Sequence, residues 1–274
     1  MAADAPARPS RVPRHRWMSS TAPWLVPVLL IGAVRPDASL AQPAGGTVMA
    51  VFAHPDDERI VGPMLARWAR EGHRVWLVIA TDGAKGIREH AGIPAGPALA
   101  RARAGEARCA ARQLGIEPPI LLGLEDAGLA SFSSLGRLRE EVARLIAAHR
   151  PRTVLTIGPE GGTGHPDHRL VGNVVTEVVQ GLAGGRGDST ALYYASLPAE
   201  RMQSAPPSQP RVTPIPERYL AVRIPFTPAD LEASNAAFAC HASQYTEVER
   251  EAVNAALAHG FGGHVHLRPW NGGG

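Results

Sequence analysis

The stretch VMAVFAHPDDE, residues 48–58, runs from six consecutive apolar residues straight into a cluster of potential metal ligands and acid/base groups. An unbroken apolar run of this length predicts a strand that is buried on both faces, which is typical of a parallel sheet. A second stretch repeats the arrangement, because the mainly apolar residues 154–157 are followed by GPEGGTG and then by HPDH at 165–168. The two stretches together predict both the fold and the site.

Apolar runs alternate with amphipathic segments after residue 46, which predicts an α/β fold: a Rossmann-like open, mostly parallel sheet with helices on both faces. With 45% hydrophobic and 19% charged residues, the composition suits such a globular fold. Residues 198–217, rich in Pro, Ser and Gln, predict a long surface loop or flap. The predicted strands are 48–53, 75–80, 120–122, 154–157 and one beginning at 192–195; the predicted helices are 60–71, 98–114, 134–149, 168–182 and a closing helix within 228–258.

The N-terminal segment resembles a secretory signal. It has four arginines, then the short apolar run 24–34, then a fifth arginine and small residues at Ser39 and Ala41 that suit cleavage after Ala41. The apolar run is shorter than the ~20 residues that span a bilayer, so no stable membrane span is expected after cleavage. We therefore expect a signal peptide at 1–41, a linker at 42–46, a catalytic domain at 47–265 and a mobile tail at 266–274. The expected location is exported, periplasmic or extracellular, with an uncleaved anchor as the alternative.

Charge and cysteine content narrow the functional class. Five of the 28 basic residues and two of the 25 acidic residues lie within 1–41, so the remaining charges balance and show no basic stripe for nucleic acid. The first strand is followed by HPDDE instead of G-x-G-x-x-G, which argues against a dinucleotide site. Cys109 and Cys240 could pair in an exported protein, but we expect two small, buried apolar residues. The oligomeric state is left open.

The two polar stretches predict one metal site. In an open parallel sheet, ligands bind beyond the carboxyl ends of strands where the strand order reverses. If the strand order is 3-2-1-4-5, the first and fourth strands are neighbours there and the two stretches face each other. A hydrolytic zinc usually takes three protein ligands and leaves one position open. His54, Asp57 and His168 are the expected ligands, with Zn²⁺ as the metal and Fe²⁺ as the alternative.

The other polar residues of the two stretches predict the catalytic groups. Asp56 is expected to be the general base for a metal-bound water. His165 is expected to stabilise the oxyanion as an imidazolium or to donate a proton. Asp167 is expected to orient His165 and to raise its pKa. Glu58 is ambiguous, because an acidic residue also suits the first turn of a helix.

These motifs resemble the PIG-L/LmbE-like zinc-dependent deacetylases, which act on N-acetylglucosamine derivatives. AHPDDE and HPDH carry the resemblance; weaker matches are Thr81-x-Gly83-x-x-Gly86, Arg103-x-x-Glu106 and His241-x-Ser243-Gln244, and together they span 47–245. The resemblance implies the same ligands, base and electrostatic catalyst. It also implies that Arg103 and Asp126 contact the substrate. The alternative for Arg103 and Glu106 is an ordinary surface pair on a helix.

The function expected from this resemblance is metal-dependent removal of an N-acetyl group from an N-acetylglucosamine-type sugar or glycoconjugate. The partner would be a small molecule or glycan. Two alternatives stay open at this point: a metal-dependent amidase or esterase on a substrate that is not a sugar, and a sugar-binding protein without activity. The presence of Asp56 and His165 argues against the second, since binding alone needs neither.

Overall fold

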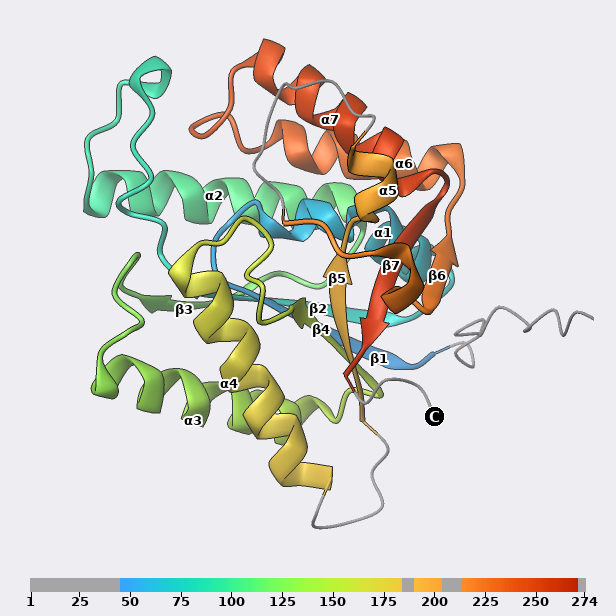
Figure 1. The fold of residues 1–274 in the computed structure, drawn as a ribbon. Helices are drawn as coiled ribbons and strands as arrows, with labels where there is room; N and C mark the ends of the chain where they lie inside the picture. The colour runs from blue at the N-terminus through green and yellow to red at the C-terminus, as the bar shows by residue number, and fades with distance from the viewer. Residues whose placement is uncertain (1–44, 184–189, 204–212, 271–274) are drawn as a thin grey trace, which may run out of the picture. The chain divides into compact units, whose positions relative to one another are not determined.

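The computed structural model describes residues 45–183, 190–203 and 213–270, which lie in one compact unit spanning 36–274. Within these residues, seven strands form one sheet in the order β3-β2-β1-β4-β5-β7-β6. The first five strands are parallel to one another, β7 pairs antiparallel with β5, and β6 pairs antiparallel with β7 (Figure 1). The strands are β1 (Thr47–Phe52), β2 (Arg74–Thr81), β3 (Ile120–Leu124), β4 (Thr153–Ile157), β5 (Ala191–Ser196), β6 (Val222–Pro225) and β7 (His264–Pro269).

Helices cover both faces of the sheet, which confirms the predicted fold class (Figure 1). One face packs against α1, α2, α6 and α7, and the other against α3 and α4. The helices are α1 (Gly62–Arg70), α2 (Pro97–Leu114), α3 (Phe132–His149), α4 (Pro166–Ala183), α5 (Ala199–Met202), α6 (Pro228–Ala239) and α7 (Glu247–Phe261), and short 3₁₀ turns span Asp57–Ile60, Glu89–Ala91 and Glu217–Tyr219.

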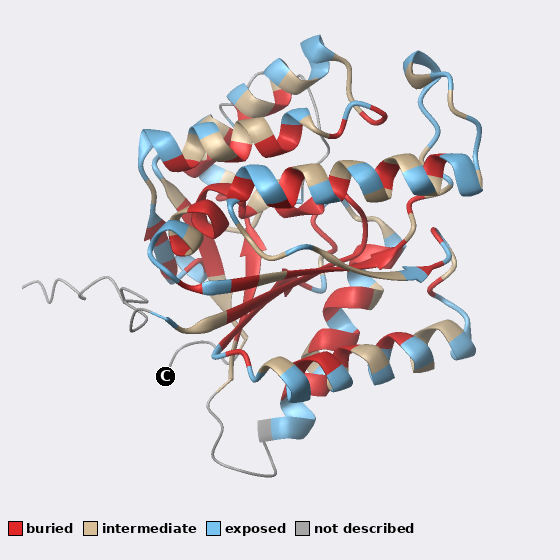
Figure 2. Ribbon diagram, turned by 180° about the vertical axis from the view of Figure 1, so that it is seen from behind, coloured by how far each residue is buried: buried red, intermediate tan, exposed pale blue. Residues whose placement is uncertain are grey.

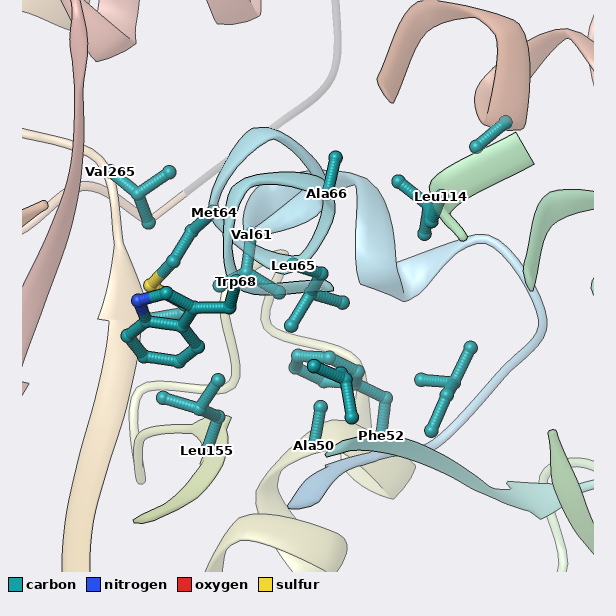
Figure 3. Packing of buried hydrophobic residues seen from close by; sticks show 14 of the residues in the cluster. Ala50, Phe52, Val61, Met64, Leu65, Ala66, Trp68, Leu114, Leu155 and Val265 are labelled. Carbon is teal, nitrogen blue, oxygen red and sulfur yellow. The ribbon is translucent and has the colours of Figure 1, made fainter. Parts of the chain in front are cut away.

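The central strand β1 is buried from residue 48 to residue 52 and β4 along its whole length, as the apolar run of β1 predicts (Figure 2). Alternate residues of β1 supply the two cores: Ala50 and Phe52 face α1, whereas Met49 and Val51 face α3 and α4. Trp68 of α1 lies over the β1 and β4 side chains (Figure 3). This two-sided burial fixes where β1 ends, and therefore where the AHPDDE stretch leaves the sheet.

The C-terminal part differs from the sequence-based prediction. The closing helix expected within 228–258 is two helices, because Thr246 and Glu249 form a capping box that begins α7 after a break at 240–246. The tail predicted at 266–274 is wrong for residues 266–269, which belong to β7 and pair with both β5 and β6. Only part of the predicted 198–217 loop is described, and there α5 and an isolated bridge from Pro198 to Ile215 add local order.

The expectation for the cysteines is also wrong, because Cys109 and Cys240 form a disulfide. It joins α2 to the end of α6, with the two Cα atoms 5.8 Å apart. No helix within the described residues is long and apolar enough to cross a membrane. The predicted signal segment lies outside the described residues.

Candidate metal centre

The predicted ligands converge at the carboxyl ends of β1 and β4, which are neighbours in the sheet. His54 Nδ1 lies 3.1 Å from His168 Nε2. Asp57 approaches both, with Oδ1 3.1 Å from His168 Nε2 and Oδ2 3.7 Å from His54 Nδ1. All three side chains are buried. His54 and Asp57 follow the end of β1 directly, whereas His168 lies in the first turn of α4, after the loop that leaves β4, so two neighbouring strands set their separation.

His54, Asp57 and His168 converge on one point, the candidate metal position. The contacts on the opposite side of each imidazole decide which ring nitrogen faces it. His168 Nδ1 lies 2.9 Å from the Gly161 carbonyl oxygen, so Nδ1 donates and Nε2 carries the lone pair. His54 Nε2 lies 3.2 Å from Asp126 Oδ1 and 3.4 Å from Asp167 Oδ2. These carboxylates require a proton on Nε2, which leaves the lone pair on Nδ1. Two lone pairs and one carboxylate therefore face a common point.

This donor set fits a divalent cation. Zinc bonds of about 2.0–2.2 Å in a tetrahedron separate neighbouring ligand atoms by roughly 3.3–3.6 Å, and the distances observed between donors are 3.1–3.7 Å. Lone pairs this close repel one another unless a positive charge lies between them. His54 also groups with His165 and His168, and separately with Asp126 and Asp167, as sets whose ligand atoms lie within 4.8 Å.

The local electrostatics favour positive charge at this point. Burial lowers the pKa of His54, but its contacts with Asp126, Asp167 and Asp57 raise it to about 11, so a bound cation would take the place of the proton on Nδ1. Burial acts in the opposite direction on Asp57, yet the neighbouring His168 and His54 hold its pKa well below the usual range. Asp57 is therefore ionised, as a ligand carboxylate must be.

Asp126 and Asp167 have different contacts from those predicted. Asp126, expected to face the substrate, is buried against His54 and accepts a hydrogen bond from the Lys85 backbone. The Asp167 carboxylate lies near His54 and accepts from the Ala127 backbone. Both carboxylates thus fix the orientation and tautomer of a ligand histidine, a usual arrangement at metal sites.

His165 also differs from the prediction. The Asp167 backbone amide donates to His165 Nδ1, so the neutral ring carries its proton on Nε2. Burial and the neighbouring His54 and His168 lower the pKa of His165, in contrast to the expected increase. The ring is only partly buried and packs edge-on against His54 with the centroids 4.7 Å apart. It is a neutral hydrogen-bond donor at the margin of the cluster.

Asp56 lies in a constrained turn between the sheet and the first 3₁₀ segment. Its φ is 100°, which a residue other than glycine rarely adopts. Its Oδ2 lies 3.4 Å from Arg59 Nη1 and 3.5 Å from Arg103 Nη2, and Arg59 Nη1 also donates to the Tyr245 hydroxyl at 2.6 Å. These groups fix one carboxylate oxygen. Arg59 and Tyr245 were not predicted, because single residues beside a motif carry no periodic signal.

Arg103 lies beneath the site and is almost fully buried, which differs from the predicted contact with substrate. Its two terminal nitrogens donate to the backbone carbonyls of Pro55 and Gly83 at 2.6 and 3.2 Å. Gly83 has φ +64°, and a Cβ there would come within 2.5 Å of the Arg103 guanidinium. Arg103 on α2 and the turn at Gly83 therefore pack together and hold the backbone of the AHPDDE stretch at Pro55.

Comparisons with known proteins agree with this geometry. The family model described as "PIG-L: GlcNAc-PI de-N-acetylase" matches residues 49–179. A 1D-myo-inositol 2-acetamido-2-deoxy-alpha-D-glucopyranoside deacetylase of Saccharomonospora viridis is 31% identical over 229 residues, which cover 73% of this chain and 85% of the relative.

A second relative, 1D-myo-inositol 2-acetamido-2-deoxy-alpha-D-glucopyranoside deacetylase 2 of Catenulispora acidiphila, is 36% identical over 173 residues, or 56% of this chain and 57% of the relative. The chain thus spans little more than half the length of some curated relatives that it matches. Among solved structures, the N,N'-diacetylchitobiose deacetylase from Pyrococcus horikoshii superposes with a TM-score of 0.63 at 22% identity, covering 82% of this chain and 84% of that one. At this identity the superposition shows a shared fold alone.

Proposed function

Because this chain belongs to the PIG-L family, we propose that it hydrolyses the acetamide of an N-acetylglucosamine derivative, releasing acetate and a free amine. The observation that carries the proposal is the convergence of the His54 and His168 lone pairs with the Asp57 carboxylate. A metal bound there, with zinc as the expected ion, would supply a Lewis acid and would lower the pKa of a bound water towards ~7.

The side chains around the proposed metal position carry out the proton transfers and stabilise the oxyanion. Asp56 accepts the proton of the attacking water through Oδ1, since Oδ2 lies against Arg59 and Arg103. His165 donates its Nε2 proton as a hydrogen bond to the acetamide oxygen, which gains charge as the water adds. Asp56 then returns the proton to the leaving nitrogen, so that acid and base are used in sequence.

The substrate class follows from the relatives that match most of the chain. The Saccharomonospora viridis protein is named for a deacetylation of an inositol glycoside of N-acetylglucosamine. We therefore propose a small glycoside with a 2-acetamido sugar as the substrate. A small cavity lined by Asp57, Thr163, His168 and Leu257 borders the proposed ligands.

The test uses purified protein, metal analysis and acetate release. Wild type should bind about one metal ion per chain and release acetate from N-acetylglucosamine glycosides faster than from simple amides. Asp56→Ala should keep the metal and lose at least ~100-fold in kcat. His168→Ala should lose the metal, and a chelator should abolish wild-type activity until metal is restored.

A matched control is Asp230→Asn, which changes a buried carboxylate at the start of α6 that pairs with Arg70. It should leave kcat within about twofold of wild type. Loss of metal from Asp56→Ala would show that Asp56 is a metal ligand, and would contradict the assignment of Asp56 as base and Asp57 as ligand. Faster cleavage of simple amides or esters than of acetylated sugars would contradict the sugar substrate.

A further inference from the structure

A buried ion pair lies directly behind the proposed general base. His241, in the break between α6 and α7, is fully buried, and its Nε2 lies 2.6 Å from Oε1 of Glu58. Glu58 is also almost fully buried. Its other carboxylate oxygen accepts a hydrogen bond of 2.9 Å from the Asp56 backbone amide. One carboxylate therefore connects the C-terminal part of the chain to the backbone of the base.

The backbone at Asp56 needs such support. A φ of 100° is unfavourable for an aspartate and persists only where the surroundings determine it fully. The hydrogen bond from the Asp56 amide to Glu58 closes the turn in this conformation. Without a donor on its outer oxygen, the buried Glu58 carboxylate would lose the contact that fixes its orientation.

His241 is itself held from the other side. The preceding residue, Cys240, is disulfide-bonded to Cys109 of α2. Two residues later, Ser243 donates through its backbone amide and its hydroxyl to the two oxygens of Glu106, also on α2. The position of the imidazole is therefore set by α2 and does not depend on the metal ligands.

Stability alone does not account for this pair. Replacing a buried ion pair with apolar residues of similar volume is often neutral or stabilising. His241 Nδ1 is buried without a hydrogen-bond partner, which makes the site still less favourable as a source of stability. The ion pair of His241 and Glu58 instead fixes the position of the Asp56 backbone.

We propose that His241 is a positioning residue, which acts through Glu58 to hold Asp56 in the conformation that accepts the proton. The inference rests on the proposed function for its kinetic consequence. Its structural consequence, the fixed backbone of Asp56, does not depend on any substrate. His241 has no exposed surface and cannot contact the substrate itself.

The experiment compares His241→Ala and His241→Gln in the full chain with the same two substitutions at His266. His266, on β7, is a suitable control because it is equally buried, uses Nε2 in one hydrogen bond, with the Phe261 carbonyl, and leaves Nδ1 without a partner. His241→Ala should lower kcat about 10-fold or more, with KM and metal content unchanged. His241→Gln, whose amide can donate to Glu58, should recover most of that loss, and neither His266 variant should change kcat after correction for the folded fraction.

Equal losses of kcat at positions 241 and 266, each in proportion to lost stability, would overturn the proposal. A crystal structure of His241→Ala supplies a readout that needs no activity, and Asp56 is expected to leave its positive φ there. An unmoved Asp56 would also overturn it. If wild type deacetylates no sugar, the proposed function fails by itself, and the Asp56 conformation still decides the role of His241.

Discussion

Arg103 shows how burial separates two roles for the same side chain. Sugar-binding arginines are exposed to substrate, whereas Arg103 is 4% exposed and donates to two backbone carbonyls. We expect Arg103→Met to lower the free energy of unfolding by about 1–3 kcal/mol, because two buried acceptors lose their donor. Urea unfolding at fixed metal concentration measures this.

The exposed Arg101 on the same helix is the control, and Arg101→Met should leave the free energy of unfolding within about 0.5 kcal/mol of wild type. A folded Arg103→Met protein with unchanged stability and a strongly raised KM would instead restore the substrate contact implied by the family resemblance.

The residues that sequence alone could predict are those whose chemistry is encoded locally. His54, Asp57 and His168 lie within two short motifs at strand ends, and the structure brings them together. The partners of Asp126 and Asp167 depend on which loop packs on which, and no spacing in the sequence encodes that. The sequence therefore indicated the right polar residues but paired Asp167 with His165, whereas its carboxylate lies against His54.

At the scale of elements, the three weaker patterns form one interlocked support. Arg103 packs on Gly83, Gln244 donates to the Gly86 carbonyl, and Ser243 binds Glu106. Arg103 and Glu106 therefore do not form the surface pair considered as the alternative. Among the parallel strands, β1, β2 and β4 were predictable because burial on both faces leaves apolar runs, whereas β3 is mostly only partly buried and left a shorter run. The strands β6 and β7 were missed, since each is short and polar at alternate positions.

The disulfide between α2 and α6 should stabilise this support. It joins residues 131 positions apart and so restricts a large loop of the unfolded chain. Replacing Cys109 and Cys240 with serine should lower the free energy of unfolding by about 2–4 kcal/mol. Denaturant titration with and without reductant measures the effect. The reductant should destabilise wild type and leave the double variant unchanged; equal responses of the two proteins would contradict a bonded pair.

For the whole molecule, the fold determines where chemistry can occur but does not select the substrate. The order β3-β2-β1-β4-β5 places the ends of β1 and β4 side by side, as expected if the parallel sheet had the order 3-2-1-4-5. Substrate choice depends on loops beyond these strand ends. Their composition carries no comparable pattern, so this part of the prediction rests on relatives and on the acetate-release assay.

We propose that the protein is exported, and two independent features support this. Residues 1–41 have the composition of a cleavable signal, and the Cys109–Cys240 bond belongs to a class that persists in oxidising compartments. Expression in a bacterium with an intact secretion pathway should yield protein outside the cytoplasm, with its N-terminus at Gln42 and both cysteines blocked to alkylation. Deleting residues 1–41 should retain the chain in the cytoplasm with reactive thiols. Recovery of the full chain from the cytoplasm, uncleaved and with both thiols free, would refute export and would leave the disulfide dependent on oxidation after purification.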